Sequence, residues 1–213
     1  MAKHARVLID SEKEMLFSYV STMKYASRNR LIMVLTHSAG MRVGEIAGLL
    51  HNDLLMTSGE VCEFSIGRAV NESTVMVGEH CYTVAKQIQL KRRNVKGNHA
   101  RSVMLSSTVQ QEIVDYYTGL STITDTGTEV FLNRFKKPMT NQRLAQEIKR
   151  WYVDCGLHGC SSHSGRRGFV TNLLDKQVNI RVVQQLVGHR QLSTTQLYAE
   201  TRDSMLREAV EML

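Results

Sequence analysis

The sequence predicts an α+β fold that is mainly α-helical and includes a small three-stranded antiparallel sheet. Apolar residues recur at helical spacing toward both ends of the chain, whereas a middle stretch alternates apolar and polar residues as strands do. No internal repeat, low-complexity tract or linker interrupts the 213 residues. A chain of this length forms one sizeable core, so we expect a single domain over residues 1–213.

Helices are expected before the strands. Residues 11–14 have the form of a helix capping box, and an apolar face follows at Met15, Leu16, Tyr19, Val20 and Met23. A second apolar run at residues 31–35 leads to Gly40, which interrupts the pattern until it resumes at residue 46. This interruption places Arg42 at a junction between two helices.

Short strands are expected between residues 61 and 105. The candidates are residues 61–66, 81–90 and 101–105, with a hairpin turn at residues 94–98 joining the last two. Residues 68–78 have no role that the sequence reveals, and we expect them to form a loop.

Helical spacing returns after Ser106. We expect helices over residues 109–117, 141–153 and 162–175, and a further helix that Asn179 caps and Gly188 ends. A short helix from Ser193 should carry Tyr198. The closing residues 203–213 are expected to form an amphipathic tail helix, with an apolar stripe at Met205, Leu206, Ala209, Val210 and Leu213.

The charge balance favours an anionic partner. The chain has 27 Lys and Arg against 20 Asp and Glu, and the cations gather in two runs, residues 86–101 and 134–150. Either run by itself could be a solvated surface, but two runs indicate a surface that faces phosphates. The expected DNA-binding residues are Lys91, Arg92, Arg93, Arg101, Lys136, Lys137 and Arg143.

The chain shows neither a secretion signal nor an apolar stretch long enough to span a bilayer. We therefore expect a cytoplasmic protein without a membrane partner, and we expect its cysteines to be reduced thiols. The cysteines are Cys62, Cys81, Cys155 and Cys160.

Four segments carry residues suited to chemistry on phosphate. They are Gly40-Met-Arg-Val-Gly-Glu-Ile46, the Lys96-Gly97 turn, His163-Ser-Gly-Arg166, and Leu186-Val-Gly-His189, which Tyr198 follows nine residues later. Each segment alone has an ordinary structural explanation, such as a surface arginine or a core histidine. Their combination in this order indicates a shared site.

In order, spacing and flanking residues these segments resemble the catalytic domain of the tyrosine recombinase (phage integrase) family, and the stretch from His163 to Tyr198 looks like its Xer-type members. The resemblance covers roughly residues 10–199. It implies six catalytic positions and a supporting Glu45, and it implies cleavage and rejoining of DNA through a 3′-phosphotyrosine. The six positions are Arg42, Lys96, His163, Arg166, His189 and Tyr198.

The residue types suit that chemistry. A planar guanidinium can hold two phosphate oxygens at once, so Arg42 and Arg166 can stabilise the charge of a phosphoryl transition state without a metal. A phenol is a poor nucleophile at neutral pH because its ordinary pKa is about 10. Tyr198 therefore needs help, for which His163 is the candidate, and His189 would donate to a phosphate oxygen. No cofactor is expected.

Lys96 is the expected general acid, although Lys91 is also basic and close to it in the sequence. We favour Lys96 because the Val95-Lys-Gly-Asn98 turn and the following strand resemble those of the family.

Three alternatives compete with this interpretation. The two Cys and two His between Cys155 and His163 suggest a zinc site, but His158 and Cys160 are spaced more tightly than structural zinc ligands are. A DNA-binding protein with this fold and no catalysis would not need the complete set of six residues. A type IB topoisomerase shares the chemistry, but the Xer-like flanking residues favour recombination.

Most family members carry an additional N-terminal DNA-binding domain, for which the residues before Arg42 leave no room. The chain is therefore either a catalytic fragment or one of the short recombinases that resemble those of mobile genetic elements. Met1 and the residues after it read as a natural start and favour a short full-length enzyme. The resemblance implies a specific double-stranded DNA site, a location at the nucleoid of a bacterial or phage-infected cell, and a tetramer on DNA. The tail helix would then be exchanged between protomers.

Overall fold

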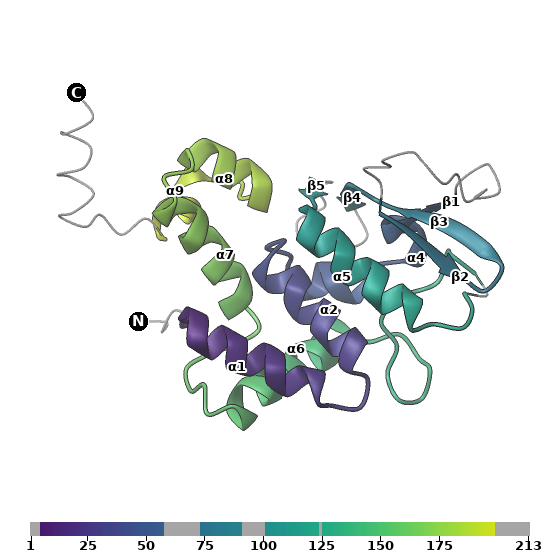
Figure 1. Cartoon of the computed structure of the whole chain (residues 1–213). Coiled ribbons are helices and arrows are strands. Elements are labelled where there is room, and N and C mark those ends of the chain that lie inside the picture. Colours follow the sequence, from purple (N-terminus) through teal and green to yellow (C-terminus); the bar gives the residue numbers. More distant parts are fainter. Residues whose placement is uncertain (1–4, 58–72, 91–100, 124, 199–213) are drawn as a thin grey trace. The chain divides into compact units, whose positions relative to one another are not determined.

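The computed structural model describes residues 5–57, 73–90, 101–123 and 125–198 (Figure 1). They divide into two compact units, one ending at Phe169 and the other beginning at Val170. We describe each unit by itself. The expectation of a single domain stays a prediction.

Helices build most of the first unit. Their bounds are α1 Asp10–Ser21, α2 Ala26–His37, α3 Val43–Ala47, α4 His51–Leu54, α5 Ser107–Thr118 and α6 Asn141–Asp154. Helix α2 contacts both α1 and α5, while α6 contacts α1 and α3. Helix α7, Ser164–Asp175, starts in this unit and ends in the second.

The apolar faces of these helices form most of the core that the sequence predicted, but Met15, expected on the apolar face of α1, is 44% exposed. Leu16 and Val20 of α1, the run from Leu31 to Leu35 of α2, and Leu144 and Trp151 of α6 are all almost completely buried. Tyr152 of α6 is buried as well, and its hydroxyl lies 2.9 Å from Nε2 of His37 at the end of α2. Burial of this much apolar surface makes the main favourable contribution to the stability of the unit.

The strands form two small antiparallel sheets. One sheet has the order β1-β3-β2, with bounds Leu55–Thr57, His80–Val84 and Thr74–Val77, and the other pairs β4 Gln87–Leu90 with β5 Arg101–Met104. Leu90 lies opposite Arg101, which agrees with the expected hairpin, although its turn at residues 94–98 lies outside the described residues. Helix α5 packs against β2 and β3.

The fold class is confirmed as mainly helical with small antiparallel sheets, but three expectations about the strands need comment. Residues 81–90 form two strands of different sheets, because the chain leaves the first sheet at Ala85 and Lys86. Residues 74–77 are strand β2, so the expected loop over 68–78 is wrong there. The expected strand at residues 61–66 lies outside the described residues.

One cysteine expectation is also wrong. Cys81 in β3 is disulfide-bonded, whereas Cys155 and Cys160 are free thiols. No helix in the described part of the chain combines the length and the apolar character that crossing a membrane requires.

The second unit contains the rest of α7, then α8 Ile180–Val187 and α9 Leu192–Gln196. The Asn179 side chain accepts a hydrogen bond from the backbone N–H of Arg181 and caps α8, as predicted. Gly188 ends α8 in the left-handed conformation, with φ of 63°. Tyr198 lies just beyond α9, in a turn in which its N–H donates to the Thr195 carbonyl.

Candidate functional site

The turn that presents Arg42 depends on Gly40. Gly40 has φ of +61°, and a Cβ atom there would lie 2.4 Å from Cδ1 of Phe169. Glycine meets both demands, because it has no Cβ and adopts positive φ without strain. Two residues later Arg42 caps α3, and its backbone N–H donates to Oε2 of Glu45 at 2.7 Å.

Glu45 is the centre of a guanidinium cluster, by which we mean Glu45 with Arg42, Arg101 and Arg166. The Glu45 side chain is only 1% exposed. Arg42 donates from Nη1 to Oε1 at 2.8 Å, and Arg101 donates to both carboxylate oxygens, at 3.0 and 2.7 Å. Bidentate pairs of this kind fix the orientation of both partners.

Arg166 reaches the same cluster from the start of α7. It is buried, it donates to the Gly40 carbonyl, and its charge acts on Glu45. A Cβ atom on neighbouring Gly165 would lie 2.6 Å from Oγ1 of Thr36, so glycine lets α7 approach α2 closely. The two glycines thus bring two arginines from distant segments to one place.

The cluster holds one negative charge among three positive ones. Burial raises the pKa of the Glu45 carboxyl, but its hydrogen bonds and charge attraction to Arg101, together with the Arg42 N–H and the Arg166 charge, lower the pKa overall. Glu45 therefore stays ionised at neutral pH and braces the arginines. The Arg42 side chain is 30% exposed, so it is less enclosed than Glu45.

His163 lies exposed just before the first residue of α7. Its carbonyl accepts the N–H of Arg167, and its own N–H donates to the Ser161 hydroxyl at 3.3 Å. The backbone of His163 is thus held at the start of the same helix that carries Arg166.

The second unit brings His189 and Tyr198 together. Their rings stack with centroids 6.1 Å apart and planes 21° apart. His189 is held by its Nδ1, which lies 3.0 Å from Oγ1 of buried Thr195, and by its carbonyl, which accepts from the Gln184 side chain. The αL turn at Gly188 directs the chain so that His189 follows α8 immediately.

The predicted DNA-binding residues differ in their surroundings. Lys136, Lys137 and Arg143 are exposed, as a DNA-facing surface requires. The Arg101 side chain is only 8% exposed and braces Glu45, a partner 56 residues away that no local sequence pattern reveals. Lys96, and with it Lys91, Arg92 and Arg93, lies outside the described residues.

In the described ranges no three His, Cys, Asp or Glu side chains converge as metal ligands would. Cys155, His158, Cys160 and His163 all belong to those ranges. The alternative zinc site has no supporting geometry.

Buried arginines around a carboxylate, and a histidine stacked on a tyrosine, are parts that suit a protein that transfers phosphoryl groups to a tyrosine. The family model described as the phage integrase family matches residues 6–205. The chain belongs to the phage integrase family.

The curated relatives of the chain include tyrosine recombinases. Tyrosine recombinase XerD of Staphylococcus haemolyticus is 28% identical over 182 residues, which are 85% of this chain and 52% of that protein. Tyrosine recombinase XerA of Pyrococcus horikoshii is 28% identical over 187 residues, with 86% and 54% covered. The chain spans about half the length of these relatives.

Solved structures share the fold. A crystal structure of XerA recombinase matches with a TM-score of 0.69 at 23% identity, over 98% of this chain and 65% of that one. The catalytic domain of bacteriophage HP1 integrase matches with a TM-score of 0.61 at 16% identity, over 98% and 95%. A third match, at 22% identity and a TM-score of 0.64, is XerH bound to its difH substrate, over 96% and 53%.

Proposed function

We propose that this chain catalyses site-specific DNA recombination. It cleaves and rejoins DNA strands through a covalent 3′-phosphotyrosine at Tyr198. Family membership over residues 6–205 supports the reaction class. The observation that carries the proposal is the guanidinium cluster, to which three separate segments contribute arginines. Glu45 pairs with Arg42 and Arg101, and the Arg166 charge acts on it.

The arginines bind the scissile phosphate in this proposal. Arg42 and Arg166 hold its non-bridging oxygens and tighten on them as charge develops in the transition state. Preorganised donors of this kind commonly contribute several kcal/mol to catalysis because they need no reorganisation during the reaction. Arg101 positions Glu45, and Glu45 positions Arg42.

Tyr198 is the nucleophile. Its phenolic oxygen forms a bond to phosphorus while the bond from phosphorus to the 5′ oxygen breaks. His163 assists removal of the phenolic proton, His189 donates a hydrogen bond to a phosphate oxygen, and Lys96 protonates the departing 5′ oxygen. The stacked ring and the Thr195 hydrogen bond that hold His189 beside Tyr198 support this division of roles.

The phosphotyrosine ester keeps the energy of the broken bond. A 5′-hydroxyl from a second duplex can therefore attack it and complete strand exchange without ATP. The partners in this proposal are a specific double-stranded DNA site and three further copies of the chain. The exposed cations Lys136, Lys137 and Arg143 contact the DNA backbone.

The test is formation of a covalent adduct on a nicked DNA substrate that carries the target site. A nick just downstream of the cleavage position lets the short fragment that bears the new 5′-hydroxyl diffuse away, so it cannot attack the ester again. The protein–DNA ester therefore accumulates and survives denaturing electrophoresis. Wild type and Tyr19→Phe should form it, because Tyr19 only bonds Asp154 at the surface, whereas Tyr198→Phe should not. An adduct formed by Tyr198→Phe would refute the assignment.

A further inference from the structure

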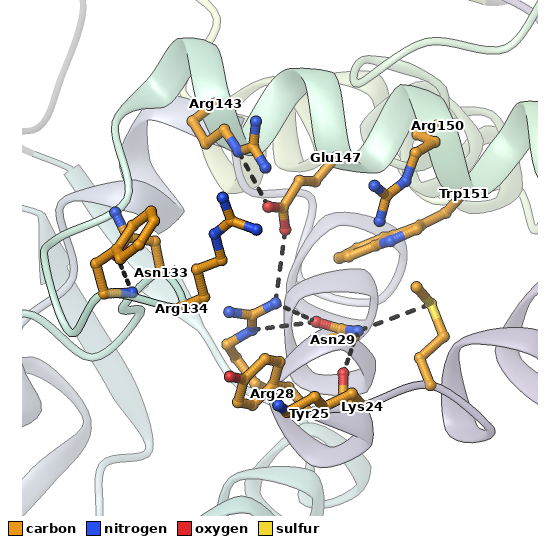
Figure 2. Close-up of a pocket in the computed structure, with 12 residues that line it drawn as sticks. Lys24, Tyr25, Arg28, Asn29, Asn133, Arg134, Arg143, Glu147, Arg150 and Trp151 are labelled. Atoms are coloured by element: carbon orange, nitrogen blue, oxygen red, sulfur yellow. Dashed lines mark hydrogen bonds and ion pairs between the residues drawn. The ribbon is translucent and has the colours of Figure 1, made fainter.

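A cavity of about 480 Å³ lies in the first unit, and none of Arg42, His163 and Arg166 of that unit lines it (Figure 2). Its walls come from three segments: the turn between α1 and α2 with the first turn of α2, one face of α6, and the turn at residues 133–135. The volume falls in the range of small-molecule sites, about 300–1,000 Å³.

The cavity is strongly cationic. Five cations line it, namely Lys24, Arg28, Arg134, Arg143 and Arg150, against one carboxylate, Glu147. Glu147 is shared by Arg28 at 3.5 Å and Arg143 at 3.1 Å. Arg134 forms no ion pair with any described carboxylate. Arg150 has only a long ion pair, 3.9 Å from its Nε to Oδ2 of Asp154 one helical turn later. Positive charge therefore remains for a ligand.

The cavity wall also contains buried donors that lack good acceptors. The indole Nε1 of Trp151 has no hydrogen-bond partner, although Trp151 is only 1% exposed. The side-chain nitrogen of buried Asn29 finds only the Lys24 carbonyl at 3.5 Å and the Met23 sulfur at 3.8 Å. Unsatisfied buried donors cost about 1–3 kcal/mol each, so a ligand rich in acceptors is favoured here.

Aromatic rings with stacked cations complete the wall. Phe135 is 67% exposed, and the Arg134 guanidinium lies 4.6 Å from its centroid. Tyr25 has a left-handed backbone with φ of 69°, and the centroid of its ring lies 4.8 Å from the Arg28 guanidinium. An aromatic ring can stack on a planar group of a ligand, and a guanidinium beside it can bind an anionic group of the same ligand.

These features together define the ligand. Duplex DNA offers phosphates and groove edges, but its bases are already stacked and gain nothing from Phe135. An acidic peptide would use the cations but not a stacking platform. A nucleotide uses both, because its phosphate meets the guanidiniums and its base stacks on the ring.

We propose that this cavity binds an unpaired nucleotide, with its phosphate on Arg134 and Arg150 and its base against Phe135. The nucleotide comes either free in solution or from a single-stranded segment of DNA, and the two sources share this chemistry. The proposal goes beyond strand transfer and requires no cleavage.

The chain provides its own probe, because Trp151 is its only tryptophan. Tryptophan fluorescence, corrected for nucleotide absorbance, would be followed while a nucleoside triphosphate, a short oligothymidylate, inorganic phosphate or an acidic peptide is added to the full chain. Calorimetry would provide a second measurement. The oligothymidylate titration uses Tyr198→Phe, so that no covalent chemistry interferes.

The variants are Arg134→Ser, Phe135→Leu and, as a matched control, Lys149→Ser. Lys149 is exposed on α6 and lies outside the cavity lining, so its variant loses the same charge without touching the site. Arg134 and Phe135 are exposed, so their variants should fold, which circular dichroism would verify. Each should weaken nucleotide binding by roughly tenfold or more, and Lys149→Ser should not.

The outcomes separate the sources and the alternatives. Binding of the triphosphate supports a free nucleotide, and binding of the oligothymidylate alone supports single-stranded DNA. Inorganic phosphate as tight as nucleotide, or the acidic peptide bound in its place, would overturn the proposal. An equal loss of nucleotide affinity in Lys149→Ser would also overturn it. The same holds if no nucleotide produces a binding heat in calorimetry or a change in tryptophan fluorescence. All these outcomes can be read whether or not the chain cleaves DNA.

Discussion

Two glycines position the arginines of the cluster. Gly40 allows the turn before Arg42, and Gly165 lets the segment with Arg166 lie against α2. The sequence indicated that both belong to motif segments, but it did not reveal why glycine is needed. The reason is a contact between residues far apart in the chain, Gly40 with Phe169 and Gly165 with Thr36.

Gly40→Ala should lower the free energy of unfolding by about 2–4 kcal/mol. The new methyl group would adopt φ of +61° and collide with the Phe169 ring, so backbone strain and overpacking add. Gly119→Ala is the control, because Gly119 has ordinary helical angles and its Cβ would meet only the Tyr116 carbonyl at 3.5 Å. Urea unfolding measures both, and equal stability of the two variants would contradict the argument.

Arg101→Ala should destabilise the protein by about 3 kcal/mol, because it leaves Glu45 buried without its bidentate partner. Arg30→Ala is the matched control. Arg30 also forms a bidentate pair, with Glu112, but its side chain is 42% exposed, so the loss should stay below about 1 kcal/mol. Chemical denaturation of both variants compares a buried with an exposed ion pair, and a similar loss would show that burial does not matter here.

At the scale of elements, helices were predicted better than strands. Long amphipathic helices such as α6 repeat their apolar pattern over several turns, so their existence and their buried faces follow from the sequence. Strands of three to five residues, such as β1 and β3, give only one or two periods. Their pairing depends on partners elsewhere, and so the break at Ala85 between two sheets could not be read from an alternating run.

The contact between α2 and α6 should make stability depend on pH. Burial, aided by the charge of Lys13, lowers the pKa of His37 to about 4 from an ordinary 6.5. The unfolded chain therefore binds a proton that the folded chain does not as the pH falls below 6.5, and the folded state loses stability until about pH 4. At about 1.4 kcal/mol for each unit of pKa, the largest loss is roughly 3 kcal/mol.

The comparison for this prediction is His37→Gln, which can still bond the Tyr152 hydroxyl but does not titrate. Urea unfolding of both proteins between pH 4 and pH 7 should show stabilities that diverge as the pH falls, with wild type losing more. Parallel curves would mean that His37 is not buried as a neutral imidazole.

At the scale of the whole molecule, the sequence grouped residues that the structure holds in two separate units. The motif order predicted one site of six residues. Arg42, His163 and Arg166 belong to the first unit, and His189 and Tyr198 belong to the second. Within each unit the arginines and the stacked rings have a defined local geometry. The bracing role of Arg101 was missed, because it depends on the fold that joins β5 to α3.

The last prediction concerns assembly and the tail at residues 203–213, which lies outside the described residues. Its sequence combines acidic residues with the apolar stripe of Met205, Leu206, Ala209, Val210 and Leu213. If the tail links each protomer to the next, deleting it should leave a folded protein that binds one DNA site with nearly unchanged affinity. That protein should form few tetrameric complexes on two duplexes, because a ring closes only when every head-to-tail contact is made.

Sedimentation with site-bearing duplex distinguishes the species. The control replaces only the charged Glu208 and Glu211 by Gln, which preserves the stripe and should preserve the tetramer. Full tetramer assembly by the truncated chain would show that another surface makes the link.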